Sequence, residues 1–235
     1  MWSQVRNKVG NDSSGTLEPL IAGKCWLIRN LLSEEECKAL IEASERSLDY
    51  ELVSGFSQYR CCYRVKFEDP PLLHWLFGKL KPFIPEYQNY WFTKYDEDSS
   101  DEEYFEEGNW IVDSLNKYPR LCKYTTSKHH FAQHYDYSVA EGRNRRSFLT
   151  FMLYLNSQGK DFTGGNTNFL STDGKTIEYS VIPEQGLGIL FLQDPQHQLL
   201  HEGEYLSSGC KYIFRTEVMF QVEPLSPKTI ELKSL

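Results

Sequence analysis

The residues in this sequence whose types and spacing could support chemistry are His134 and Asp136. They form an H-x-D pair near the end of the stretch KYTTSKHHFAQHYDY, residues 123–137. On a β-strand or at its end, side chains two residues apart point to the same face. One imidazole and one carboxylate on a common face supply two ligands of a metal site. A third ligand has to come from elsewhere in the chain.

His201, in the segment LLHEGEYLSSGCKYIFRTEVMF, is the candidate for the third ligand. Two histidines and one carboxylate make the facial triad that binds non-haem Fe(II) and leaves coordination positions open. His197 is a rival because it lies four residues earlier and would share a face with His201 on one strand. The Asp194-Pro195 pair before His197 indicates a turn, which favours a loop position for that histidine.

The composition is that of a globular protein and excludes several classes of function. The 235 residues are 40% hydrophobic and 14% aromatic, without an apolar run long enough to span a bilayer. The sequence has no basic face of the kind that binds nucleic acid. The six cysteines contain no C-x-x-C pair and are expected to be free thiols. Together with a polar N-terminus that lacks a signal sequence, these features predict a cytoplasmic or nuclear protein.

The negative charge is concentrated in one segment. Residues 96–107, DEDSSDEEYFEE, hold eight acidic residues and no basic one, which equals the net charge of −8 of the whole chain. Such a segment is expected to be a solvated surface insert. The alternative is a docking strip for a basic partner.

Two helices are predicted in the N-terminal third, after a flexible arm at residues 1–24. Ser33 and Glu36 have the S-x-x-E spacing of a capping box, which predicts a helix that begins after Ser33. Asp69 followed by Pro70 predicts a second helix start, because a proline in the first turn costs no hydrogen bond.

The remainder of the chain, from about Tyr118, shows short apolar segments separated by turn residues. Many short strands without intervening helices indicate a sandwich or a barrel. With the two helices, this pattern predicts a single α+β domain, mainly β, over residues 25–235, with its β core at about 118–221. A first strand is expected at 25–32, and the later segments are 121–126, 147–156, 167–172, 176–182, 187–193, 198–203 and 211–223.

Further motifs occur in a fixed order around the three candidate ligands. They are Tyr124, the strand RSFLTFMLYLN, Gly164-Gly165-Asn166-Thr167, Pro183 with Gly186, and the closing HEGEYLSSGCKYIFRTEV. In this order they resemble the prolyl 4-hydroxylase-like branch of the Fe(II)/2-oxoglutarate dioxygenases over roughly residues 25–221. The resemblance implies a double-stranded β-helix, a jelly-roll barrel, backed by the N-terminal helices.

The resemblance also assigns residues to the metal and to the co-substrate. It implies that His134, Asp136 and His201 bind Fe(II), each imidazole through Nε2. Lys211, ten residues after His201, occupies the place of the cation that binds the distal carboxylate of 2-oxoglutarate. Arg215 is the alternative for this clamp. It shares a strand face with Lys211, and its other interpretation is an ion pair with Asp136.

Three residues with hydroxyl groups are implied to contact the co-substrate. Tyr154 resembles the family tyrosine that helps to hold the distal carboxylate, Thr150 shares its strand face, and Tyr124 is similar to a further contact. Packing is the alternative for these residues, because strands commonly carry tyrosine and threonine. His129 and His130 are expected to be exposed or substrate-side groups, and the glycines 164 and 165 to serve backbone geometry.

The implied function is hydroxylation of an amino-acid residue, proline, in a peptide or protein. The cofactors are Fe(II), 2-oxoglutarate and O2, with release of succinate and CO2 and with ascorbate as reductant. One alternative is the same chemistry on another amino acid or a small molecule, and another is an inactive β-helix binding module. The retained triad and Lys211 argue against the inactive module. Two departures from the family are the glycine-poor loop TTSKHH and the residues Glu217 and Phe220, which stand where aspartate and tyrosine are common.

Overall fold

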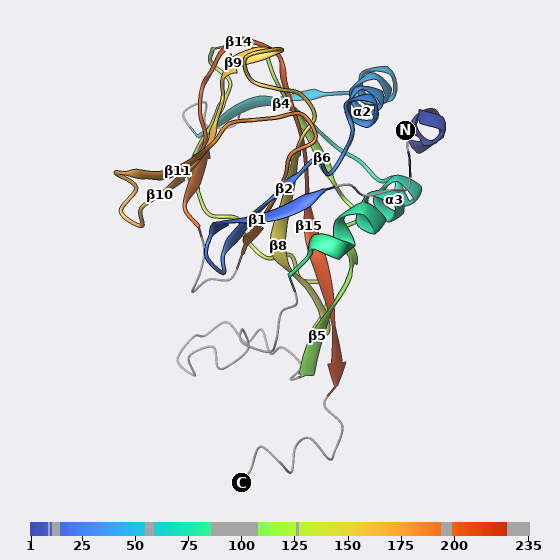
Figure 1. Cartoon of the computed structure of the whole chain (residues 1–235). Helices are drawn as coiled ribbons and strands as arrows, with labels where there is room; N and C mark the ends of the chain where they lie inside the picture. Colours follow the sequence, from blue (N-terminus) through green and yellow to red (C-terminus); the bar gives the residue numbers. More distant parts are fainter. Residues whose placement is uncertain are drawn as a thin grey trace.

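The computed structural model of the protein describes residues 1–8, 10, 15–54, 59–85, 108–125, 127–193 and 199–224 (Figure 1). The acidic segment 96–107 and His197 lie outside these residues. The helices are α1 (Trp2–Val5), α2 (Glu34–Ser47) and α3 (Pro70–Leu80), with short 3-10 turns η1 (Arg6–Lys8) and η2 (Lys81–Phe83). The strands are β1 (Thr16–Ile21), β2 (Cys25–Arg29), β3 (Glu51–Val53), β4 (Arg60–Lys66), β5 (Gly108–Leu115), β6 (Arg120–Tyr124), β7 (His130–His134), β8 (Arg145–Tyr154), β9 (Phe162–Gly164), β10 (Thr167–Leu170), β11 (Ile177–Val181), β12 (Gly188–Leu192), β13 (His201–Gly203), β14 (Leu206–Gly209) and β15 (Lys211–Pro224).

The strands form an almost closed antiparallel barrel. Within the described residues, the main sheet runs in the order β1-β2-β12-β8-β15-β6-β4-β7-β13-β10-β11, with β3 on β4 and β5 on β15. Strand β4 joins the two halves because it pairs with β6 at one end and with β7 at the other. This arrangement confirms the predicted double-stranded β-helix and the mainly β fold class.

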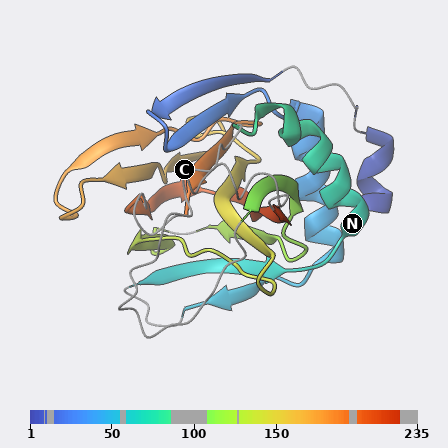
Figure 2. The same cartoon turned by 90° about the horizontal axis from the view of Figure 1, so that it is seen from below.

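The helices cover one side of the barrel, where Figure 2 shows α2 and α3 side by side. The capping box of α2 is confirmed: the Glu36 amide donates to Ser33 Oγ at 3.2 Å, and the Ser33 amide donates to Glu36 Oε2 at 2.9 Å. The N-terminus of α3 is also confirmed, since Asp69 Oδ1 accepts from the Leu72 amide at 3.2 Å. The second oxygen of Glu36 accepts from Lys79 Nζ at 2.8 Å, which links the two helices through a buried ion pair.

Two hydrophobic cores lie on opposite faces of the main sheet. Strand alternation sends Phe214 of β15 towards the helices and its neighbour Ile213 into the barrel. The helix-side core includes Leu40, Leu76, Leu121, Phe151 and Phe214. The barrel core includes Cys62, Cys122, Tyr124, Tyr154 and Ile213. Two of the residues expected to contact the co-substrate, Tyr124 and Tyr154, therefore belong to the barrel core.

The N-terminal region differs from the flexible arm expected over residues 1–24. Residues Thr16–Ile21 form β1, which pairs antiparallel with β2 and adds an edge strand to the sheet. The turn between them is closed by the Lys24 amide, which donates to the Ile21 carbonyl at 3.0 Å. Pro19 lies in β1, a position that an edge strand tolerates because one side of its backbone needs no partner.

The cysteines are free, as predicted. All six lie in the described part of the chain, and none forms a disulfide. Among the described residues, no helix has the length and apolar character that a membrane crossing requires.

Candidate metal centre

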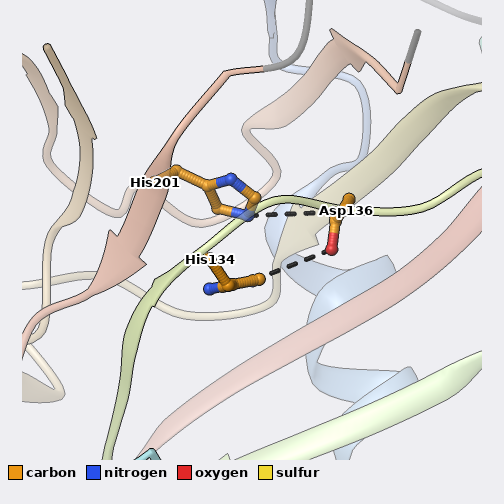
Figure 3. A group of neighbouring side chains, drawn as sticks. All are labelled: His134, Asp136 and His201. Carbon is orange, nitrogen blue, oxygen red and sulfur yellow. Dashed lines mark ion pairs between the residues drawn. The ribbon is translucent and has the colours of Figure 1, made fainter. Parts of the chain in front are cut away.

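The side chains of His134, Asp136 and His201 point toward one another, and their ligand atoms lie close together (Figure 3). His134 ends β7 and His201 begins β13, and these two residues are directly opposite in the antiparallel pair. His134 Nε2 lies 3.7 Å from Asp136 Oδ1, and His201 Nε2 lies 3.7 Å from Asp136 Oδ2. One ligand atom from each residue lies within 4.8 Å of the others, and all three side chains are buried. This is a suitable separation for three atoms around one metal ion.

Hydrogen bonds of the backbone fix the orientation of both imidazoles. Nδ1 of His134 is 2.8 Å from the Ala132 carbonyl, and Nδ1 of His201 is 2.9 Å from the Leu199 carbonyl. Because a carbonyl only accepts, each Nδ1 carries the proton and each Nε2 presents its lone pair towards Asp136. Burial and the neighbouring His201 imidazole lower the pKa of His134 to about 3. Burial also lowers the pKa of His201, so both rings are neutral at pH 7.

Asp136 is held in its ionised form by two neighbours. Thr150 Oγ1 donates to Oδ2 at 2.7 Å, and the Arg215 guanidinium contacts Oδ1 at 2.6 Å. Burial alone would raise the pKa of Asp136, but Arg215 and the imidazoles lower it below its usual range. The ion pair with Asp136, one of the two interpretations of Arg215, is therefore confirmed.

Thr150 is the start of a buried relay that the sequence did not reveal. Its hydroxyl accepts from Gln193 Nε2 at 2.9 Å, and Gln193 Oε1 in turn accepts from Ser147 Oγ at 2.7 Å. The Thr150 hydroxyl thus contacts a candidate metal ligand, and its contact with the co-substrate stays a prediction. Gln193 ends the apolar segment 187–193, and this polar residue in an apolar segment was the only sign in the sequence of a buried hydrogen bond.

Lys211 is a buried ammonium group in the barrel core. Its Nζ donates to the Gly165 carbonyl and lies 5.6 Å from the ring centroid of Tyr124 and 5.3 Å from that of Tyr154. Within the described residues it forms no ion pair, and burial lowers its pKa to about 7. A buried cation without a carboxylate is suited to receive an anionic ligand.

Gly165 allows the close approach of its backbone to Lys211. Its φ is +73°, and a Cβ at this position would lie 3.3 Å from Lys211 Cδ. The geometric role expected for the glycine pair is consistent with these values.

The two tyrosines flank this lysine. Tyr124 is opposite Lys211 in the β6–β15 pairing, and Tyr154 is fully buried. The Tyr154 hydroxyl donates to Thr167 Oγ1 at 2.6 Å, which anchors its ring in the core. Both rings therefore lie close to Lys211, and their contact with the co-substrate stays a prediction.

The two histidines before the triad are buried, so their expected exposure is wrong. Nδ1 of His129 accepts from the Thr125 amide at 2.9 Å, and the ring of His130 stacks on Tyr205 at 4.2 Å between centroids. Their position in a polar loop suggested exposure, but His130 starts β7 and the adjoining strands cover both rings.

A comparison with family models finds a match for the part of the chain that contains all three residues of the triad. Residues 119–216 match the model of the 2OG-Fe(II) oxygenase superfamily. This match covers less than half of the chain, and it supports a 2-oxoglutarate-dependent dioxygenase that uses Fe(II) and O2. No curated protein matches the sequence significantly.

The fold is similar to solved prolyl hydroxylases from three sources. A viral collagen prolyl hydroxylase from Paramecium Bursaria Chlorella virus-1, in a 2OG complex, is 20% identical, with 87% of this chain and 100% of that chain covered and a TM-score of 0.53. A Pseudomonas putida prolyl-4-hydroxylase is 14% identical, with coverages of 86% and 95% and a TM-score of 0.54. A Trichoplax adhaerens prolyl hydroxylase, in complex with a hypoxia inducible factor peptide fragment, is 15% identical, with coverages of 99% and 92% and a TM-score of 0.55. At these identities the likeness establishes the fold.

Proposed function

We propose that His134, Asp136 and His201 bind Fe(II), and that Lys211 binds the distal carboxylate of 2-oxoglutarate. The single observation that carries this proposal is the convergence of two Nε2 lone pairs and one ionised carboxylate within 4.8 Å. Two neutral imidazoles and one carboxylate form a donor set suited to Fe(II).

The co-substrate site is proposed to lie between the triad and Lys211. The ammonium group would exchange its contact with the Gly165 carbonyl for one with the dianion, which offsets the cost of burying its charge. Tyr124 and Tyr154 would line the same space, with the Tyr154 hydroxyl within reach of the distal carboxylate. Thr150 would act indirectly, by fixing the orientation of Asp136.

When bound, Fe(II) supplies with 2-oxoglutarate and O2 the oxidative chemistry that hydroxylates a C–H bond and releases succinate and CO2. The chain itself positions the ligands and excludes water. Phe131 stacks on His134 with 3.5 Å between ring centroids, and Phe191 packs edge-on to His201 at 4.8 Å. These rings hold the imidazoles in a water-poor environment.

The proposed substrate is an amino-acid residue, proline, in a peptide or protein. The fold similarity to prolyl hydroxylases supports this choice, and one of them was solved with a peptide fragment. Ascorbate is proposed as the reductant that returns the metal to Fe(II). We also propose that one domain over residues 25–235 carries the activity and that it functions in the cytoplasm or nucleus, for which the free thiols are the support.

The test is a turnover assay combined with mass spectrometry. Purified protein with Fe(II) and ascorbate should convert 2-oxoglutarate to succinate, and a screen of proline-containing peptides should find a product that gains one oxygen atom. The variants His134→Ala, Asp136→Ala and His201→Ala should abolish both signals. His74→Ala is the matched control, because His74 is exposed on α3.

Two outcomes would contradict the assignment. Full turnover in His201→Ala, or its loss only in His197→Ala, would exclude His201 as the third ligand. Oxygen gain on a residue other than proline, or on a small molecule, would replace the proposed substrate while the metal site stands. A protein that binds Fe(II) and 2-oxoglutarate without any turnover would favour the inactive binding module.

A further inference from the structure

Three neighbouring strands place an unusual number of cations on the inner face of the barrel. Side chains alternate along β4, β6 and β15, so those that share a face with Cys62, Cys122 and Ile213 point into the barrel core. We call those of these cations that are buried or half-buried the basic wall: Arg60, Arg64, Arg120, Lys211 and Arg215.

The carboxylates beside the basic wall do not balance its charge. Within the described residues, only Asp136 and Glu217 form ion pairs with it. Glu217 pairs with Arg120 at 2.6 Å and with Arg215 at 3.2 Å. In the proposed function, Fe(II) and the 2-oxoglutarate dianion cancel each other's charge, so the excess of positive charge remains after both are bound. The wall stands out further because the whole chain carries a net charge of −8.

Arg60 has a free hydrogen-bonding edge. Its Nε is buried and has no hydrogen-bond partner within the described residues, although such buried donors are rare. One terminal nitrogen donates to Cys122 Sγ at 3.3 Å. A buried guanidinium whose donors have a hydrogen-bond partner on only one edge can donate to an anionic ligand from its other edge.

Arg64 is a second cation without an acid partner. It is half-buried, and no described carboxylate forms an ion pair with it. Burial, followed by repulsion from Arg60, lowers its pKa. The two arginines therefore repel each other in a place where a shared anion would attract both.

The positive charges of Arg60 and Arg64 also affect the pKa of a neighbouring thiol, that of Cys122. Cys122 is buried, which by itself would raise its pKa. A hydrogen bond from Cys62, together with Arg60, Arg215 and Arg64, lowers the pKa of Cys122 to about 6. The Cys62 hydrogen bond is the largest cause, and the contribution of the three arginines is consistent with the positive charge of the basic wall.

This part of the wall is adjacent to the metal centre. The Arg60 guanidinium lies 4.2 Å from the centroid of the Phe131 ring, and that ring stacks on His134. Tyr59, which is 48% exposed, packs edge-on to both Phe131 and His134. A ligand that approaches the metal past Tyr59 would thus pass close to Arg60, with only the Phe131 ring between them.

We propose that Arg60 and Arg64 bind an acidic side chain of the peptide substrate, close to the residue that is hydroxylated. This inference rests on the proposed function and names its substrate class: a peptide with a carboxylate, or another anionic group, beside the target residue. Lys211 is occupied by 2-oxoglutarate and Arg215 by Asp136, so Arg60 and Arg64 are the cations left for the substrate.

The experiment measures peptide binding without turnover. Three fluorescent peptide pools have a central proline and neutral random flanks, and the two positions beside the proline are Asp, phosphoserine or Asn. Binding is measured by fluorescence anisotropy to the full chain loaded with Mn(II) and 2-oxoglutarate without O2. Either anionic pool should bind about tenfold tighter than the Asn pool, as expected for one charge-assisted contact.

The variants Arg60→Gln and Arg64→Gln should remove this preference, and Arg60→Lys should retain part of it. Arg46→Gln, on the exposed side of α2, is the matched control and should leave it unchanged. Thermal unfolding of each variant separates a lost contact from a lost fold. Equal binding of all three pools by the folded wild-type protein would overturn the proposal.

Conversion of 2-oxoglutarate in the absence of peptide separates this inference from the proposed function. If Arg60→Gln weakens 2-oxoglutarate binding more than tenfold and keeps the peptide preference, Arg60 belongs to the co-substrate site and the inference is wrong. If the wild-type protein fails to convert 2-oxoglutarate, the proposed function fails, whereas a preference for anionic peptides would still support the basic wall as an anion-binding site.

Discussion

Lys79 and Lys211 are two buried lysines with opposite surroundings. Their exposed fractions are 4% and 3%, so both lose nearly all contact with water. Lys79 lies between the helices and pairs with Glu36 at 2.8 Å, whereas Lys211 in the barrel meets a carbonyl and two aromatic rings. The first lysine has its counter-charge within the chain. The second, on our proposal, receives its counter-charge from solution, and this distinguishes a structural cation from a binding cation.

The largest effect is expected when the structural pair is broken. Lys79→Ala leaves Glu36 buried without its cation, which should lower the free energy of unfolding by about 3–5 kcal/mol. Denaturant titration measures this change. The 2-oxoglutarate affinity of the remaining folded protein should stay the same, and a loss of affinity would contradict the division between the two lysines.

Lys211→Ala should show the reverse pattern. Removing the cation should weaken 2-oxoglutarate binding by about a hundredfold, because a buried charge pair loses one partner. Isothermal titration with the Mn(II)-loaded protein gives the dissociation constant. Stability of the free protein should fall little or even rise, since an unpaired buried charge is removed. An unchanged affinity would exclude Lys211 from the co-substrate site.

The pH dependence of 2-oxoglutarate binding should distinguish the two lysines further. The pKa of Lys211 is lowered to about 7 by burial, so the free protein loses this proton as the pH rises above 7. Binding of the dianion requires the protonated form, and the dissociation constant should therefore rise by up to about tenfold per pH unit above that value. Lys211→Arg should flatten the curve, because arginine stays charged. A flat wild-type profile between pH 7 and 9 would contradict this role.

The smallest effect concerns the backbone that receives Lys211. Gly165→Ala introduces a side chain at a φ of +73°, with its Cβ 3.3 Å from Lys211 Cδ. It should destabilise the fold by about 1–2 kcal/mol and weaken 2-oxoglutarate binding a few-fold. Gly78→Ala is the control, because it lies within α3 where a Cβ meets open space, and it should stabilise the protein slightly. Equal responses of the two variants would argue against a positioning role for Gly165.

Local signals in the sequence were sufficient for the helices and for most of the barrel strands. The Ser33 capping box and the Asp69-Pro70 pair act over three residues, and the structure forms both. The apolar segments after residue 118 correspond to strands because they are short, carry β-branched and aromatic residues, and are separated by turn residues. The H-x-D pair was found from residue types and spacing and His201 with the help of the family resemblance, and the three side chains lie close together.

Contacts that depend on strand register were not predictable. Arg60 lies in the segment RCCYRVK, whose mixed pattern does not reveal a strand, and its neighbours Phe131 and Cys122 are distant in the sequence. The side on which Thr150 lies followed from alternation, but its partner Asp136 depended on how the loop after β7 folds back. Such contacts depend on the register of strands throughout the sheet, so no short stretch of the sequence predicts them.

Strand β4 pairs with strands of both halves of the barrel, with β7 at its start and with β6 at its end. Arg60 and Cys61 pair with β7, which carries a candidate metal ligand, and Tyr63 to Lys66 pair with β6, which lies beside the strand of Lys211. A one-residue insertion or deletion between these two parts of β4 would turn the side chains of one part to the opposite face relative to the other. We therefore expect variation within β4 to consist of side-chain substitutions at constant strand length. Changes in chain length are expected in the loops.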